Sequence, residues 1–336
     1  MPLAEKDRSP VRCAIVTIRW GILGTGGIAR TFTEDLLLLG HEVAAVGSRA
    51  PGTAEAFADR YGIDRAYGSY AELAADDGID VVYVATTHNT HHGAARLCLE
   101  NGRGVLVEKP FTTSAADAKD LANLARERRL FAMEAMWTRF NPLVTRLRDL
   151  VADGAIGDVK AVYADFSENF PFDASHRLWA PDLAGGALLD LGVYPVSFAW
   201  MLLGEPDTVQ AVTTPAPTGV DANTGILFGY GSGAVALLHC GFMAQTPQTA
   251  TISGTTGRIE VAGPFWHPHA MTLHRDGVEP ETYRLEVTGH GYTYQAEEVA
   301  RCLDAGLTES PAMPLEESVG IIGALDTIAG RLSAQI

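Results

Sequence analysis

Hydrophobic and polar residues follow two different patterns along this chain, and the first pattern fills residues 18–136. There, short apolar runs are separated by stretches whose apolar residues recur at helical spacing. Strands and helices that alternate in this way indicate an α/β fold with a parallel sheet covered on both faces. The predicted strands are 17–23, 41–48, 79–86, 104–110 and 130–136, and the predicted helices are a stretch ending near residue 40 and residues 50–62, 91–102 and 114–129.

After residue 136, strand-like segments follow one another with glycine-rich turns between them. We therefore predict an N-terminal extension, 1–17, a first domain, 18–136, and a second domain, 137–336. The predicted strands of the second domain are 158–168, 208–214, 222–230, 233–242, 248–261 and 270–277, and two helices, about 292–306 and 315–333, close the chain.

A glycine-rich turn follows the first predicted strand and opens the first predicted helix. Its sequence, Gly24-Thr25-Gly26-Gly27-Ile28-Ala29, fits the pattern G-x-G-x-x-G/A with alanine at the last position. In this context backbone N–H groups and the helix N-terminus can hold a pyrophosphate. An ordinary turn is the alternative, since the chain has 35 glycines. The strand-turn-helix context favours a Rossmann domain that binds a dinucleotide.

The end of the second predicted strand carries the residues that would distinguish NAD from NADP. An acidic side chain usually holds the NAD ribose there, whereas a basic one accommodates the 2′-phosphate of NADP. This chain has Gly47, Ser48 and Arg49 and no carboxylate at that point. A hydroxyl and a guanidinium can hold a phosphate, so the sequence predicts NADP(H). The alternative is that Arg49 caps a helix or lies in solvent.

Charge and cysteine content narrow the possible partners and location. With 41 acidic residues against 25 Lys plus Arg, the net charge of the 336 residues is −16. This balance argues against a surface for nucleic acid or for an anionic membrane. Because Cys13, Cys98, Cys240 and Cys302 show no paired spacing, we expect free thiols in a reducing cytoplasm. We expect no membrane span and no secretory signal.

Four motifs occur in a fixed order: the glycine turn, "VATTHNTHH" from residue 84, "VLVEKPF" from residue 105 and "GGALLDLGVYP" from residue 185. Together they resemble the Gfo/Idh/MocA family of oxidoreductases. "EAMWTRFNP" (134–142) and "ESPAMPLEES" (309–318) are most similar to its branch of dimeric dihydrodiol dehydrogenase and NADP-dependent D-xylose dehydrogenase. The resemblance implies a second domain with a large, open, predominantly antiparallel sheet. Its exposed face often joins subunits, which implies a dimer or tetramer.

Three residues are candidates for the chemistry. Hydride transfer from an alcohol carbon needs a base for the hydroxyl proton, and the reverse reaction uses the same group as an acid. Lys109 ends a predicted parallel strand at its carboxyl end, where ligands bind in such sheets. The resemblance implies that Lys109 lies beside the substrate hydroxyl and the nicotinamide ribose. It also implies that Asp190 and Tyr194 form the family's Asp-x-x-x-His/Tyr pair.

In a helix, Asp190 and Tyr194 would share one face. We expect the Lys109 ammonium to lower the pKa of Tyr194 by favouring phenolate, and oxidation to be fastest at alkaline pH. The alternatives are a lysine that reaches the surface, and a helix cap beside a packed tyrosine.

Further candidates surround this set. Glu108 and the residues after the third predicted strand are expected near the nicotinamide or its ribose. We predict no metal site, because carboxylate and cysteine ligands are missing at ligand spacing around the histidines. Aromatic side chains suit the apolar face of a sugar or cyclic diol. The cofactor candidates after the third strand are Thr86, His88, Asn89 and His91; the candidates for the substrate wall are Trp137, Arg177, Trp179 and Tyr194, with less support for Trp266 and Tyr292.

These observations predict a cytoplasmic NADP(H)-dependent oxidoreductase that acts on a hydroxyl or carbonyl carbon of a sugar or cyclic diol. Tyr194 would be the acid/base, assisted by Lys109 and Asp190. A keto-sugar or dicarbonyl reductase of the same family is the alternative enzyme. A regulator that senses the nucleotide without catalysis is the alternative of another class, although it would have no need of an acid/base set.

Overall fold

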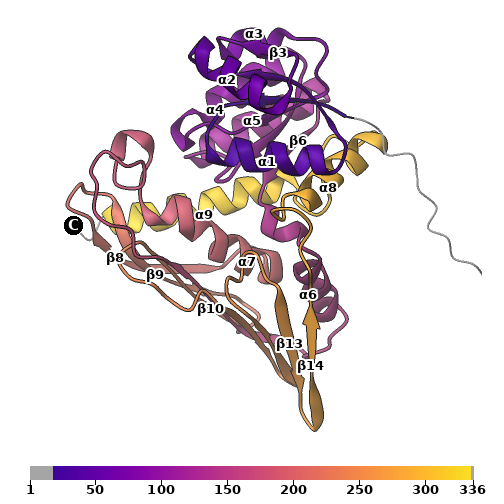
Figure 1. Ribbon diagram of the computed structural model, residues 1–336. Coiled ribbons are helices and arrows are strands. Elements are labelled where there is room, and N and C mark those ends of the chain that lie inside the picture. Colours follow the sequence, from indigo (N-terminus) through magenta and orange to yellow (C-terminus); the bar gives the residue numbers. More distant parts are fainter. Residues whose placement is uncertain (1–17, 334–336) are drawn as a thin grey trace, which may run out of the picture.

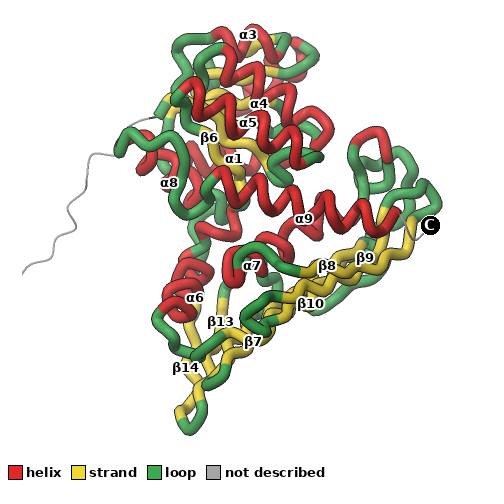
Figure 2. Tube along the Cα trace, turned by 180° about the vertical axis from the view of Figure 1, so that it is seen from behind, coloured by secondary structure: helices red, strands yellow, loops and turns green. Residues whose placement is uncertain are grey.

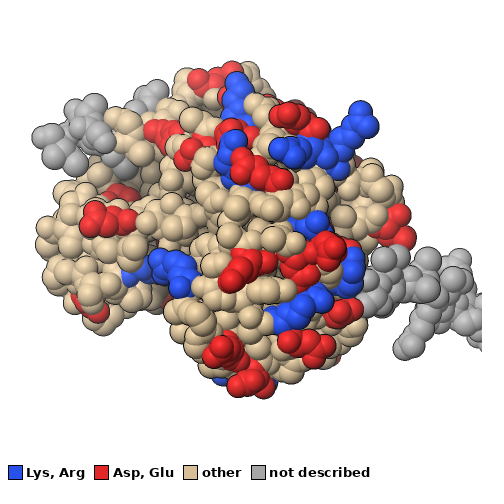
Figure 3. Space-filling model, turned by 90° about the horizontal axis from the view of Figure 1, so that it is seen from above, with Lys and Arg blue, Asp and Glu red and all other residues tan. Residues whose placement is uncertain are grey.

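The computed structural model describes residues 18–333, which form two parts, each built on one sheet (Figure 1). The predicted extension, 1–17, and Cys13 lie outside the described residues. The two sheets lie at opposite ends of the molecule, with helices between them. The face formed by the first part carries acidic and basic side chains interspersed with one another (Figure 3).

The first sheet consists of parallel strands with helices on both sides. Its strands are β1 Arg19–Leu23, β2 Glu42–Gly47, β3 Arg65–Tyr67, β4 Val81–Val84, β5 Gly104–Glu108 and β6 Ala132–Ala135, and its helices are α1 Gly27–Leu38, α2 Pro51–Tyr61, α3 Tyr70–Ala75, α4 His91–Glu100 and α5 Ala115–Arg128. The strand order is β3-β2-β1-β4-β5-β6. The order reverses between β1 and β4, the usual place for a ligand in an open α/β sheet. The predicted parallel α/β fold is confirmed, although β3 and α3 are absent from the prediction.

The second sheet is mostly antiparallel, as the resemblance implies. Its strands are β7 Val159–Ser167, β8 Thr208–Pro215, β9 Asp221–Gly229, β10 Val235–Gly241, β11 Ala250–Gly254, β12 Gly257–Val261, β13 Ala270–Arg275 and β14 Val278–Arg284; the helices are α6 Pro142–Ala152, α7 Val193–Leu203, α8 Thr293–Asp304 and α9 Leu315–Ser333. The order is β14-β13-β12-β11-β7-β10-β9-β8, and only β7 and β10 pair in parallel. Buried and exposed residues alternate along β9, so one face packs against α7 and α9 and the other is open (Figure 2).

Elements of the second part also differ from the prediction. The predicted strand 248–261 is the hairpin of β11 and β12. β14 escapes a pattern-based prediction because it is an edge strand with almost every residue exposed. α6 is also absent from the prediction, although Asn141 and Pro142 form a recognisable helix start. The Oδ1 atom of Asn141 accepts the N–H of Leu143 at 2.9 Å.

The last two helices connect both parts of the molecule. α8 packs against α1, and α9 packs against α5 and also against α7 and β8. The N–H of Ala115, at the start of α5, donates to Oδ2 of Asp326 in α9 at 2.7 Å. The predicted boundary at 136 therefore separates the two sheets in sequence, while the end of the chain contacts both parts.

Among residues 18–333, one helical region is long and apolar enough to cross a membrane by length and hydropathy alone. It spans Pro181–Leu203, and 72% of its apolar window is buried inside the structure. A core helix has this combination of hydropathy and burial, because it is apolar on all sides.

Candidate active site

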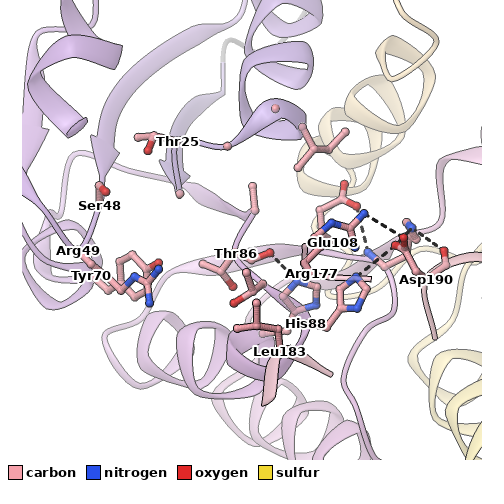
Figure 4. A pocket seen from close by; sticks show the side chains of 18 of the residues that line it. Thr25, Ser48, Arg49, Tyr70, Thr86, His88, Glu108, Arg177, Leu183 and Asp190 are labelled. Atoms are coloured by element: carbon pink, nitrogen blue, oxygen red, sulfur yellow. Dashed lines mark hydrogen bonds and ion pairs between the residues drawn. The ribbon is translucent and has the colours of Figure 1, made fainter. Parts of the chain in front are cut away.

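A pocket of about 590 Å³ lies where the first sheet reverses its strand order (Figure 4). It extends from the glycine turn after β1 to side chains of the second part. Five predicted site residues are not part of its lining: Ala29, Asn89, Trp137, Trp179 and Trp266. The lining consists of Gly24, Thr25, Gly26, Gly27, Ile28, Ser48, Arg49, Tyr70, Ala85, Thr86, Thr87, His88, His91, Glu108, Lys109, Arg177, Leu183, Asp190, Tyr194 and Tyr292.

The glycine turn leaves open space at the start of α1. Gly24 has φ +111°, and a Cβ there would lie 2.4 Å from the carbonyl oxygen of Ala85, so glycine is required. A Cβ at Gly26 would meet no atom within 4 Å and would instead fill the pocket. The first helical bond runs from the N–H of Arg30 to the oxygen of Gly26, so the N–H groups of 27–29 have no helical acceptor. This arrangement fits a pyrophosphate.

Two further parts of the pocket offer polar groups for the rest of a dinucleotide. Thr86 follows β4, and its Oγ1 atom is buried with no hydrogen-bond partner among the described residues. Because buried hydroxyls normally have a hydrogen-bond partner, a polar group of a bound ligand is expected to bind to this one. Ser48, Arg49 and Tyr70 lie together at the far end of the pocket (Figure 4). Ser48 Oγ lies 2.6 Å from Oγ1 of Thr53, and the Arg49 side chain is exposed.

The other end of the pocket is built around a buried carboxylate. Asp190 is 4% exposed. Lys109 Nζ donates to the backbone oxygen of Asp190 at 2.9 Å and to Oδ1 at 3.1 Å. Arg177 Nη2 donates to Oδ2 at 2.9 Å, and His88 Nε2 lies 3.5 Å from Oδ1. Burial alone would raise the pKa of Asp190, but the Lys109 and Arg177 charges outweigh it and hold this pKa below its usual range.

Tyr194 is buried, and its hydroxyl accepts a hydrogen bond from Trp137 Nε1 at 3.0 Å. The Lys109 ammonium lies 4.8 Å from the centroid of the Tyr194 ring, over its face. The expectation that Lys109 lowers the pKa of Tyr194 is wrong for this structure. Burial raises that pKa, and the Glu108 and Asp190 carboxylates raise it further. The Lys109 charge is directed to Asp190 and not to the tyrosine hydroxyl.

The local backbone explains how Asp190 and Tyr194 reach the same pocket. Leu188–Gly192 forms one π-helical turn, and α7 begins at Val193. Such turns are frequent at functional sites. Here the backbone oxygen of Asp190 bonds to the Lys109 ammonium. The stretch from Asp190 to Tyr194 is therefore helical, but the helix is widened at the position of Asp190.

The two predicted histidines occupy different positions. His91 is fully buried, and its ring nitrogens lie 2.8 Å from the oxygen of Pro110 and 3.2 Å from that of Thr86. It therefore packs between the segments that follow β5 and β4, and its single N–H can donate to one of these two oxygens. Burial lowers the pKa of His91 to about 4 and that of His88 to about 3, so both rings are neutral near pH 7. Asn89 is exposed and donates to the oxygen of Asp182 at 3.0 Å.

Glu108 is the last residue of β5, directly before Lys109, and is buried. Its carboxylate accepts hydrogen bonds from the Tyr83 hydroxyl and from the N–H of Lys109. Burial raises the pKa of Glu108 to about 7. The two lining carboxylates, Glu108 and Asp190, both belong to this end of the pocket, away from Arg49 (Figure 4).

Aromatic rings form a layer behind the lining. Trp137 stacks on Tyr292 with ring centroids 4.3 Å apart, and Tyr292 itself lines the pocket. Trp179 packs edge-on against Phe242 at 4.4 Å. Trp137 thus supports the wall from behind through Tyr292, whereas the ring partner of Trp179 lies outside the lining. Sequence reasoning missed Tyr70, Ala85, Thr87 and Leu183 as lining residues; Ala85 and Thr87 flank the predicted Thr86, whereas no pattern points to Tyr70 or Leu183.

Known proteins match nearly the whole chain. A family model for "Oxidoreductase family, NAD-binding Rossmann fold" matches residues 18–135, and one for "GFO/IDH/MocA C-terminal domain" matches residues 144–260. A trans-1,2-dihydrobenzene-1,2-diol dehydrogenase of Bos taurus is 38% identical over 324 residues, which cover 93% of this chain and 96% of that protein. A D-xylose 1-dehydrogenase (NADP(+)) of Hypocrea jecorina is 38% identical, covering 92% of this chain and 90% of that protein.

Solved structures agree with these matches. A 3-ketoreductase from Actinomadura kijaniata, in complex with NADP and TDP-benzene, has a TM-score of 0.82 and 27% identity. The match covers 94% of this chain and 98% of that one. The aldose-aldose oxidoreductase from Caulobacter crescentus, at 22% identity, shares the fold with a TM-score of 0.86 over 95% and 98% of the two chains. With its two sheets and its glycine turn, the chain belongs to the Gfo/Idh/MocA family of oxidoreductases.

Proposed function

We propose that the protein is an NADP(H)-dependent oxidoreductase acting on a CH–OH or carbonyl carbon of a sugar or cyclic diol. The observation that carries this proposal is the convergence of Lys109, Asp190 and Tyr194 in the pocket that begins at the glycine turn. Relatives described as acting on a diol, on xylose or as a 3-ketoreductase support this substrate class. When bound, the nicotinamide supplies or accepts the hydride.

The hydrogen bond from Trp137 makes the Tyr194 hydroxyl an acceptor toward the indole and a donor toward the pocket. Indole Nε1–H is a donor only, so it occupies a lone pair of the Tyr194 oxygen and leaves the tyrosine proton free to donate. In this proposal Tyr194 donates that proton to the substrate oxygen when a carbonyl is reduced, and the Tyr194 oxygen takes the proton back when a hydroxyl is oxidised. Lys109 adds a positive charge beside the same oxygen, which stabilises the negative charge that develops there. Asp190, which also accepts a hydrogen bond from Arg177, holds the lysine in place.

The experiment that tests this function is an assay of the purified protein in both directions. NADP⁺ is supplied with a trans-dihydrodiol or an aldose, and NADPH with a keto-sugar or a dicarbonyl. Turnover of any of them supports the proposal, and the favoured direction separates the dehydrogenase from the reductase. Tight NADPH binding without any turnover would favour the nucleotide-sensing regulator.

Arg49 is the residue that we expect to give the preference for NADP over NAD. Removing a charge-assisted hydrogen bond to a phosphate costs about 2 kcal/mol, or roughly thirtyfold in affinity. Arg49→Ala is therefore expected to lower the ratio of kcat/KM for NADP over NAD by that factor, mainly through the KM of NADP. Arg60→Ala, an exposed arginine of α2 outside the pocket lining, is the matched control. An unchanged ratio in Arg49→Ala would refute the role of Arg49.

We propose that the open face of the second sheet joins two subunits. Its exposed apolar side chains come from neighbouring strands: Tyr163 of β7, Val212 of β8, Leu227 of β9 and Leu237 of β10. Leu237 is paired in register with both Tyr163 and Leu227, so these three form one row across the sheet. A continuous apolar face of this kind is typical of an interaction surface.

Leu237→Asp is expected to convert the dimer to monomer, because a symmetric contact buries the new charge from both copies. Sedimentation at several concentrations measures the change. Leu307→Asp, a leucine that is 39% exposed after α8, is the control. A Leu237→Asp protein that keeps the oligomeric state of the wild type contradicts this interface.

We also propose a cytoplasmic location. Cys98, Cys240 and Cys302 are free and buried, and unpaired thiols suit a reducing compartment. Fractionation of the native cells tests this location.

A further inference from the structure

A carboxylate from the cofactor-binding part holds the loop that carries Tyr292 into the pocket. Asp35 lies in α1 and is 1% exposed. Its Oδ1 atom accepts the N–H of His290 at 2.8 Å. Its Oδ2 atom accepts the N–H groups of Tyr292 at 2.8 Å and Thr293 at 3.1 Å. One buried side chain therefore fixes three backbone donors at the start of α8.

The loop is shaped for this contact by two glycines. Gly289 has φ +59°, and a Cβ there would lie 2.3 Å from Oδ1 of Asp35. Gly291 has φ +91°, and a Cβ there would lie 2.7 Å from Nε2 of His267 and 3.2 Å from Cζ3 of Trp137. Both the backbone conformation and the available space require glycine. The loop is thus packed between Asp35 on one side and Trp137 on the other.

This packing connects Asp35 to the proposed proton donor. Tyr292 stacks on Trp137 with an interplanar angle of 21°, and Trp137 Nε1 donates to the Tyr194 hydroxyl. α1, which carries Asp35, also begins at the glycine turn. The same helix therefore contacts the cofactor end of the pocket and, through two stacked rings, the position of the Tyr194 hydroxyl.

We propose that Asp35 is a positioning residue for the reaction, which rests on the function proposed above. Asp35 is not part of the pocket lining and acts through the backbone of Tyr292. By fixing that backbone, Asp35 determines the position of the Tyr292 ring. The stacked Trp137 ring and the Tyr194 hydroxyl bonded to it are positioned in turn. A small displacement of a reacting group costs a large factor in rate even when the change is made far from the chemistry.

Asp35→Asn tests the proposal because it keeps the size of the side chain but replaces one acceptor oxygen by an NH₂ group. We expect kcat/KM for the carbonyl or hydroxyl substrate to fall by about tenfold to hundredfold. NADPH affinity, measured by fluorescence titration, is expected to stay at the wild-type value. The near-UV circular dichroism of the Trp137–Tyr292 pair, defined by subtracting the spectrum of Trp137→Phe, is expected to diminish.

Asp326→Asn is the matched control, since Asp326 also accepts a backbone N–H across the two parts but lies outside the pocket. It is expected to lower Tm without changing kcat/KM or the dichroism. If Asp35→Asn does not fold, Asp35→Glu, which keeps the charge one methylene further out, is expected to show the same pattern to a smaller degree.

Two results separate this proposal from the proposed function. Equal kcat/KM and equal dichroism in the Asp35 variant and the Asp326 control would overturn the positioning role. A wild-type protein without turnover would overturn the proposed function, and the dichroism alone would then decide whether Asp35 orders the aromatic pair.

Discussion

Lys109→Met is expected to lower kcat by about a thousandfold, because it removes the ammonium and its proton from the substrate oxygen while keeping the length of the side chain. Asp190 keeps its bond to Arg177, so its charge is not left unpaired. The fold and NADPH binding are therefore expected to persist. Steady-state kinetics and a fluorescence titration with NADPH measure the two effects separately.

Lys119→Met is the control, since Lys119 is an exposed lysine of α5 outside the pocket lining. It is expected to behave as the wild type in both measurements. A Lys109→Met protein whose kcat stays within about tenfold of the wild type would contradict the proposed charge at the substrate oxygen.

Tyr194→Phe is expected to lower kcat by about a hundredfold, because it removes the proposed proton donor and keeps the ring beneath the Lys109 ammonium. It also leaves the buried Trp137 N–H without its acceptor, which costs about 1–3 kcal/mol of stability. Kinetics and thermal unfolding measure the two losses. Tyr67→Phe, which removes a hydroxyl that donates to Asp76 outside the pocket, is expected to lower stability without lowering kcat.

The expected dependence of kcat/KM on pH follows from the burial of Tyr194. Its pKa is raised above the usual value, so the hydroxyl stays protonated in the free enzyme from about pH 6 to pH 10. The kcat/KM profile for carbonyl reduction is therefore expected to lack an alkaline limb that depends on Tyr194. Oxidation, in which the Tyr194 oxygen takes up the proton, is still expected to be faster at alkaline pH. An alkaline limb in the reduction profile that disappears in Tyr194→Phe would contradict the raised pKa.

The sequence was most informative where a residue type at a given place in the fold has essentially one physical explanation. A glycine turn between strand and helix predicts the pyrophosphate end of the pocket, and Gly24 and Gly26 lie there. A lysine at the carboxyl end of an apolar strand points to the sheet edge, and Lys109 lines the pocket there. Their proposed roles remain predictions. The parallel sheet follows from periodicity alone, because each strand is bounded by a helix.

Features that depend on contacts between distant segments could not be predicted. Tyr70 reaches the pocket from a short helix that has no pattern to mark a site. Tyr292 was predicted only as one aromatic candidate among several, and its place in the pocket depends on a glycine loop. The pKa of Tyr194 depends on how deeply tertiary packing buries it, and the sequence suggested only the nearby charge. The bonds of Asp35 join segments some 255 residues apart, which no local spacing reveals.

The central claim is that this pocket transfers a hydride directly between substrate and nicotinamide, with Lys109 at the substrate oxygen. The most direct measurement uses a diol or aldose deuterated at the reacting carbon, with NADP⁺, followed by mass spectrometry of the reduced cofactor. The account predicts that the deuterium appears in the NADPH formed by the wild type, and that Lys109→Met forms almost none. Reduced cofactor without deuterium, or tight NADPH binding with no turnover of any substrate, would contradict it.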